Sequence, residues 1–153
     1  MPRALACSLL ILAHACSVAG EPPAEGMTPL WQIGQADRQT AEFALAPGGY
    51  RAYRQPGLFV VGQSDPRRDW PYVQPGPLDE WATASPQTFE VYFGLAAAPA
   101  AGACRLTLAL ADTHSAGPPR LRVEVNAQTW EMDTPKGAGD KSIVGDAAKG
   151  RPH

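Results

Sequence analysis

The feature that most constrains this chain is a succession of short apolar runs, each bounded by glycine or proline. Apolar and polar residues alternate at 105–111 and 121–126, and residues 57–62 contain a continuous apolar run of strand length. The helical repeat of about 3.6 residues is almost absent from the chain. The sequence contains 16 prolines and 15 glycines, which suit many turns between short strands. The pattern predicts an all-β fold, specifically an antiparallel β-sandwich.

Further strands are expected at 29–34, 42–45 and 88–95, which brings the expected total to about six or seven. Both alternating segments carry polar residues on their second face, as antiparallel sheets allow. The side chains expected to face the core are Trp31, Phe89, Val91, Phe93, Leu106, Leu108, Leu110, Leu121, Val123 and Val125. Cys104 is expected to be a small buried hydrophobe.

The first 20 residues have the pattern of a secretory signal peptide, with Arg3, an apolar run at 5–13 and small residues before Glu21. The run is shorter than the roughly 20 apolar residues that a membrane span requires. A lipoprotein signal that uses Cys16 is the alternative. We therefore expect a secreted or periplasmic protein, with a linker at 21–28 and one domain at 29–153.

Net charge and cysteine content exclude several function classes. The formal charge is −2, and no basic face for nucleic acid or basic amphipathic helix for a membrane surface is visible. Cys104 is the one cysteine left after the signal peptide, so no intramolecular disulfide is predicted. The core alone is therefore expected to stabilise the domain.

The sequence offers no convincing catalytic site. Beyond the signal peptide the histidines are His114 and His153, and no Gly-x-Ser-x-Gly motif is present. Cysteines and histidines are too few for a metal cluster, and the carboxylates Asp79 and Glu80 fit a solvated surface. No catalytic residue and no cofactor are predicted. Asp37 and Glu42 flank a turn, which they either cap or equip with oxygens for a structural Ca²⁺.

Binding has better support than catalysis. A charged and aromatic loop occupies residues 65–72, and Trp81 follows in another loop. Sugars are held by aromatic rings and by hydrogen-bonding side chains on loops above a rigid scaffold, and Arg67–Arg68 suit the carboxylates of an acidic glycan. The alternative is that Trp70 and Trp81 cover the end of the sandwich. The candidate carbohydrate-binding residues are Asp65, Arg67, Arg68, Asp69, Trp70, Tyr72 and Trp81.

Several motifs resemble one family of domains. They are Trp31-x-Ile-Gly34 with Asp37 and Glu42-Phe43, then Phe59-Val-Val-Gly62, Asp69-Trp-Pro71 and Val123-x-Val-Asn126, with a later loop at 145–152. Together they resemble the carbohydrate-binding-like domain III of family four polysaccharide lyases, the rhamnogalacturonan lyases. The resemblance covers about residues 29–153, where Trp-x-Ile-Gly and Asp-Trp-Pro are its most specific motifs.

The resemblance implies a galactose-binding-like jelly roll in a secreted, pectin-degrading setting. The family's catalytic domain uses a lysine and a histidine, and it has no counterpart here, so no catalytic residue is carried over. The strand count, below the eight of a jelly roll, leads us to expect a domain truncated at its C-terminus. The expected function is non-catalytic binding of a pectic or other acidic polysaccharide. The alternatives are a lyase acting by β-elimination and a structural module that packs on a catalytic domain.

Overall fold

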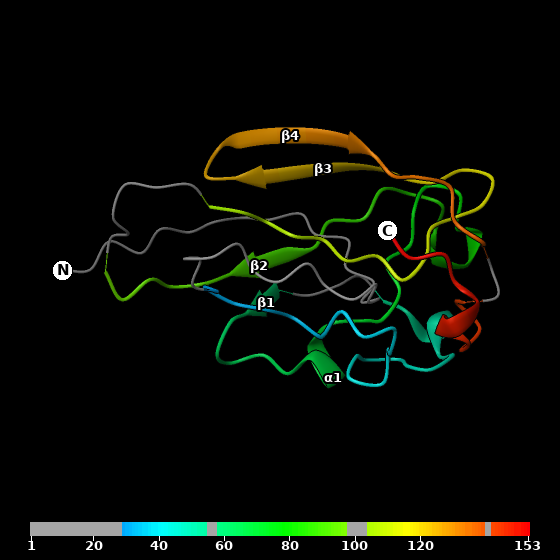
Figure 1. Cartoon of the computed structure of the whole chain (residues 1–153), viewed down its shortest axis with the longest axis horizontal. Coiled ribbons are helices and arrows are strands. Elements are labelled where there is room, and N and C mark those ends of the chain that lie inside the picture. Colours follow the sequence, from blue (N-terminus) through cyan, green and yellow to red (C-terminus); the bar gives the residue numbers. More distant parts are fainter. Residues whose placement is uncertain (1–28, 55–57, 98–103, 140–141) are drawn as a thin grey trace.

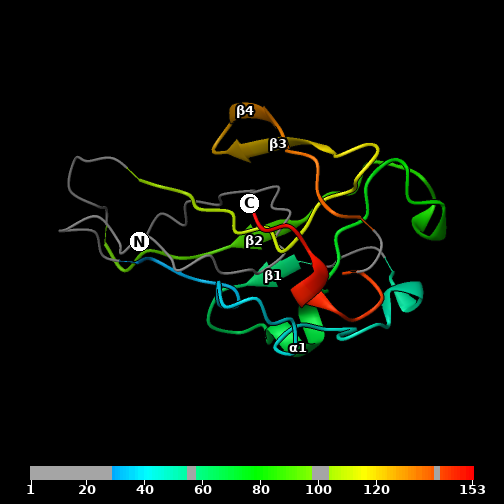
Figure 2. The ribbon, with the colours of Figure 1, turned by 45° about the vertical axis from the view of Figure 1, so that its right-hand side comes forward.

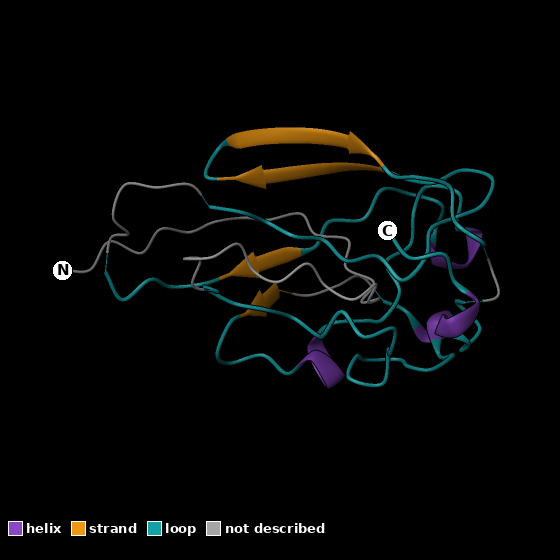
Figure 3. Cartoon of the chain, viewed as in Figure 1, coloured by secondary structure: helices purple, strands orange, loops and turns teal. Residues whose placement is uncertain are grey.

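The computed structural model describes residues 29–54, 58–97, 104–139 and 142–153. The predicted signal peptide and linker lie outside these described residues. Short strands and short helical turns are joined by long loops (Figure 3). The elements in chain order are η1 (Tyr50–Ala52), β1 (Leu58–Val60), α1 (Pro66–Asp69), η2 (Glu80–Ala82), β2 (Glu90–Tyr92), β3 (Arg120–Val125), β4 (Gln128–Asp133) and η3 (Ala147–Lys149).

The described strands form two pairs. β1 and β2 are parallel, with Phe59 opposite Val91, whereas β3 and β4 form an antiparallel hairpin. The hairpin lies on one side of the molecule, and β1, β2 and α1 lie on the other (Figures 1 and 2). The strands predicted within 57–62, 88–95 and 121–126 are thus confirmed in part of their length. The expected antiparallel pairing is wrong for β1 and β2.

The β3–β4 hairpin is built by alternation and by its turn. Leu121 and Val123 are buried, while Arg120 and Arg122 point outward and form ion pairs with Glu131 and Glu124. The two-residue turn has positive φ at both positions, which matches the right-handed twist of the strands, as in a type I′ turn. β4 was not predicted, although the alternation at 128–133 and the preceding turn were visible signals.

The core is centred on aromatic rings from β1, from the residue that follows α1 and from the residue that precedes β2. Trp70 is completely buried, and its ring centroid lies 5.7 Å from Phe59 and 5.6 Å from Phe89. Val91 and Val123 complete the enclosure. The prediction that Phe89 and Val91 face the core is therefore confirmed. Contacts between these rings hold the loop after α1 against the β1–β2 pair. Large buried aromatic side chains contribute much of the stability of a core, so we expect these contacts to be important.

The segment 105–111 is not a strand, which corrects the sequence prediction. Leu110 is buried and Leu108 is half-buried, but Leu106 is exposed. Among the described residues, the backbone ladder of this segment consists of the reciprocal pair between Leu110 and His153, at 3.0 and 2.9 Å. Alternation alone does not make a strand, because the backbone groups of a strand need a partner along its length.

The other sequence expectations have mixed outcomes. Residues 29–34 are irregular, and the strand expected at 42–45 is reduced to one bridge between Ala44 and Pro71. Trp31 is half-buried against Phe93, with ring centroids 5.6 Å apart. Cys104 is exposed, so the expectation that it is buried is wrong. It precedes the part of 105–111 that pairs with no described strand.

Asp37 and Glu42 hold the turn between residues 34 and 43. Asp37 Oδ1 accepts a hydrogen bond from the Gln39 amide at 2.8 Å, and Glu42 Oε1 accepts one from the Gln35 amide at 3.1 Å. These bonds satisfy backbone donors that the turn leaves free, which is the usual role of such side chains. The capping alternative is therefore confirmed for both carboxylates.

Candidate functional site

The predicted loop begins as a capped turn. Asp65 is the N-cap of α1, since its Oδ1 accepts the Arg67 amide at 2.9 Å, and Pro66 occupies the first helical position. The Asp65 amide in turn donates to Asp69 Oδ2 at 2.8 Å. This reciprocal arrangement forms a rigid exposed corner.

Charge on this corner is largely matched internally. Arg68 donates through Nε and Nη2 to the two carboxylate oxygens of Asp69, at 2.8 and 2.7 Å. The Arg68 guanidinium, together with the Asp65 amide, lowers the pKa of Asp69 below its ordinary value. The Asp69 carboxylate likewise raises the pKa of Arg68. Both arginines remain exposed, so their outer N–H groups face solvent.

Trp70 and Tyr72 do not belong to a surface site. They are 0% and 1% exposed, because the chain turns into the core after α1. The Ala44 amide donates to the Trp70 carbonyl, and the Tyr72 amide donates to the Ala44 carbonyl. The Tyr72 hydroxyl donates to the carbonyl of Ile143. A buried ring cannot stack on a sugar, so this structure removes both residues from the predicted contacts.

Trp81 lies apart from α1, at the end of the molecule where η1, η2 and η3 gather; we call this the loop end (Figure 1). Its ring is half-buried and packs edge-on against Tyr50 and Tyr53, with centroids 5.1 and 6.0 Å away. Its Nε1 donates to Asp79 Oδ1 at 3.0 Å. The predicted residues thus separate into an exposed corner, two core rings and one ring at the loop end.

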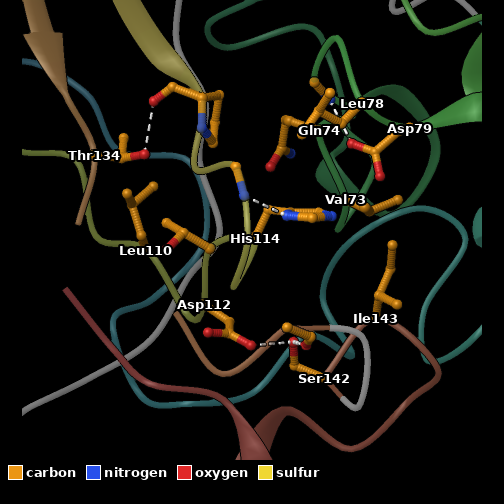
Figure 4. Close-up of a pocket in the computed structure, with 15 residues that line it drawn as sticks. Val73, Gln74, Leu78, Asp79, Leu110, Asp112, His114, Thr134, Ser142 and Ile143 are labelled. Atoms are coloured by element: carbon orange, nitrogen blue, oxygen red, sulfur yellow. Dashed lines mark hydrogen bonds between the residues drawn. The ribbon is translucent and has the colours of Figure 1, made fainter. Parts of the chain in front are cut away.

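A pocket of about 80 Å³ opens at the loop end. Three loop segments supply its walls: residues 73–79, residues 110–119, and a third formed by residues 134–139 and 142–143 (Figure 4). Val73, Leu78, Leu110 and Ile143 provide the apolar part of the lining. The polar part includes Gln74, Asp112 and His114, which the sequence had not indicated as members of one site.

Gln74 contributes a buried amide to this pocket. The residue is 5% exposed, and its Nε2 donates to the Pro71 carbonyl at 2.6 Å. That bond fixes the amide orientation, because the opposite orientation would place two oxygens against each other. Oε1 therefore points away from that carbonyl, on the pocket side of the residue (Figure 4); it is buried, and it accepts no hydrogen bond from any described residue.

His114 contributes an oriented ring. Its Nδ1 accepts hydrogen bonds from the amides of Ala116 and Gly117, at 3.2 and 2.9 Å. An Nδ1 that accepts from two amides carries no proton, so in the neutral ring the proton is on Nε2. Figure 4 shows the Nε2 edge of the ring extending into the pocket. The pocket wall therefore contains an unpaired acceptor, from Gln74, and an oriented donor, from His114.

Asp112 connects the segments that form the pocket. Its Oδ1 accepts the Ala138 amide at 2.7 Å and the Arg151 amide at 3.2 Å, while Oδ2 accepts the Ser142 hydroxyl at 2.7 Å. With these donors the carboxylate is satisfied within the protein, although the residue is buried. Its role is to hold the C-terminal segment against the 110–114 loop.

No signal in the sequence grouped Gln74 with His114, since they are 40 residues apart and neither lies on a periodic element. The described residues contain no group of three His, Cys, Asp or Glu side chains placed to hold a metal ion. None of the helices in the described part of the chain has the length and apolar character needed to cross a membrane.

Comparisons with known proteins give a consistent result. The family model described as CBM-like, polysaccharide lyase family 4, domain III, matches residues 29–151. A rhamnogalacturonate lyase from Dickeya dadantii (strain 3937) is 34% identical over 146 residues, which is 88% of this chain and 23% of that protein. The chain therefore spans about a quarter of the curated relative that it matches. No solved structure matches the chain significantly.

Proposed function

The chain belongs to the CBM-like, domain III family of polysaccharide lyase family 4, and from this premise we propose that it is a non-catalytic module that binds a pectic or other acidic polysaccharide. The family match over residues 29–151 is the observation that carries the proposal. The relative's name, rhamnogalacturonate lyase, gives the polymer to test first. The CBM-like family implies a β-sandwich, and we propose that it has jelly-roll connectivity, which an experimental structure with complete strand order would test.

The exposed corner at α1 suits the acidic units of such a polymer. Arg67 and Arg68 are exposed, and their guanidinium groups can donate paired hydrogen bonds to a carboxylate. Asp65 and Asp69 hold the corner in shape. Trp81 lies elsewhere, so we assign it to support of the loop end.

Affinity gel electrophoresis against rhamnogalacturonan and a panel of pectins tests the proposal. We expect retardation of the wild-type chain by an acidic polymer and weaker retardation, by at least about tenfold in affinity, after Arg67→Ala with Arg68→Ala. Arg120→Ala with Arg122→Ala removes the same charge from the outer face of β3 and is expected to bind normally. If no glycan retards the wild-type chain, the proposed function is wrong. If both double variants lose the same polymer affinity, the corner at α1 is not the binding site.

The alternative suggested by the relative's name is lyase activity in this chain. It predicts that absorbance from unsaturated uronate ends grows when the chain is incubated with the polymer. We expect no such growth. Export through residues 1–20 is part of the proposal, and the N-terminal mass of the exported protein tests it.

A further inference from the structure

We infer that the pocket at the loop end holds one neutral sugar unit of a polysaccharide, inserted by an edge of its ring, with Gln74 and His114 as the hydrogen-bonding residues. The inference rests on the proposed function and adds a second contact region to it. The α1 corner and the pocket have different chemistry, so they would contact different units of the polymer.

The strongest observation is the state of Gln74. A buried amide oxygen without a partner is rare in folded proteins, because it has lost hydration and gained nothing in return. Among the described residues, the other buried side-chain atom without a partner is Nε1 of Trp70, and that residue is enclosed in the core. Gln74 instead lines the pocket, and its Oε1, which lies buried in the pocket wall, would reach an arriving hydroxyl through a small shift of the side chain.

His114 makes the site selective for groups that both donate and accept. Its Nε2 proton is fixed by the two amides on Nδ1, so the ring presents a donor beside the Gln74 acceptor. A sugar hydroxyl has one donor and two acceptor lone pairs. One hydroxyl can therefore donate to Gln74, while the same or a neighbouring hydroxyl accepts from His114.

The charge of the lining argues for a neutral sugar. The 15 residues that line the pocket include the carboxylates of Asp79 and Asp112 and no lysine or arginine. Asp79 is held by the amide of Gly76 at 2.6 Å and by the indole of Trp81. A uronate carboxylate would meet two like charges and no cation among the described lining residues, which disfavours it electrostatically.

Volume and apolar surface define how much of the sugar enters. About 80 Å³ is well below the roughly 300–1,000 Å³ of sites that enclose a whole small molecule. One edge of a ring fits, with its C–H groups against Val73, Leu110 and Ile143. A 6-deoxyhexose suits this wall best, because its methyl group adds apolar contact.

Ligand-observed NMR on the full chain, with methyl rhamnoside, methyl galactoside and galacturonate as probes, tests the inference. We expect saturation transfer to the rhamnoside, less to the galactoside and none to galacturonate. His114→Asn keeps an acceptor for the Ala116 and Gly117 amides and removes the Nε2 donor, and Gln74→Met removes the acceptor at similar size. Each is expected to lower rhamnoside affinity at least about tenfold. Far-ultraviolet circular dichroism and the thermal midpoint show whether each variant is folded.

The double variant Arg67→Ala with Arg68→Ala separates this inference from the proposed function. It is expected to retain the rhamnoside signal while losing retardation by the acidic polymer. Rhamnoside binding by the wild-type chain, with no retardation of that chain by any polymer, would support the pocket and overturn the proposed function. Unchanged rhamnoside transfer in folded His114→Asn and Gln74→Met, preferential binding of galacturonate, or no transfer to any neutral sugar would overturn the pocket.

Discussion

Gly34 shows how one position depends on both backbone conformation and packing. Its φ is +71°, and a Cβ at this position would overlap the ring of Phe43. Phe43 itself is buried in the core. A side chain at residue 34 would therefore cost both left-handed strain and displacement of a core ring.

We predict that Gly34→Ala lowers the free energy of unfolding by about 2–4 kcal/mol, measured by urea denaturation. Gly62→Ala is the matched control, because Gly62 has φ of +82° and a Cβ added there would meet no other atom within 4 Å. It is expected to cost only the strain, about 1–2 kcal/mol. Equal losses at the two positions would show that the Phe43 contact contributes nothing.

Tyr72 gives the domain a dependence on alkaline pH. Burial raises the pKa of Tyr72 from 10.0 to about 12, and burial also raises the pKa of Tyr53. Between these two values the unfolded chain has lost the Tyr72 proton while the folded chain keeps it. Stability is thus fully present below pH 10 and is lost as the pH rises toward about 12.

For Tyr72→Phe we predict a smaller loss of stability between pH 10 and pH 12 than in the wild type, measured as the shift of the urea midpoint. The variant is expected to be less stable than the wild type below pH 10, because it lacks the hydroxyl bond to the Ile143 carbonyl. Parallel pH profiles for the two proteins would contradict the assignment.

At the scale of elements, strands formed where alternation coincided with an available partner. β3 pairs with β4 along its whole length, and its Leu121 and Val123 are buried as predicted. The segment 105–111 alternates just as regularly but has no comparable partner among the described residues. Alternation identifies which face of a segment would be buried, and the sequence predicted this. Backbone pairing also requires a second segment alongside, and the sequence did not show which segments have one.

The turn of the β3–β4 hairpin offers a test of this element. Ala127 has φ of +66°, a conformation that glycine adopts without strain and alanine does not. We predict that Ala127→Gly, which creates the favoured Asn-Gly turn, raises the free energy of unfolding by about 0.5–1 kcal/mol. Chemical denaturation measures this, with Ala148→Gly, in the exposed turn η3, as a control expected to stabilise nothing. A loss of stability in Ala127→Gly would contradict the turn assignment.

At the scale of the whole molecule, Asp112 links segments that are far apart in the sequence. Its carboxylate receives donors from residues 138, 142 and 151, and the neighbouring Leu110 pairs with His153. The C-terminal segment is therefore attached to the middle of the chain at the loop end. The pocket walls depend on this attachment, since two of its three segments meet there.

We predict that Asp112→Ala lowers the free energy of unfolding by about 2–3 kcal/mol, because buried donors are left without an acceptor. The control is Asp133→Ala, an exposed carboxylate on β4 whose removal is expected to cost less than about 0.5 kcal/mol. Amide hydrogen exchange should show faster exchange at Ala138 and Arg151 in Asp112→Ala. Unchanged exchange there would contradict the linking role.

The sequence by itself determined the all-β character of this domain, the positions of β1, β2 and β3, and the family to which the domain belongs. These properties follow from local alternation, turn residues and short motifs, which neighbouring residues carry. Only the tertiary structure decided that Trp70 is in the core and that Gln74 and His114 line the same pocket. Burial and convergence depend on contacts between distant segments, and no local pattern specifies which distant segments meet.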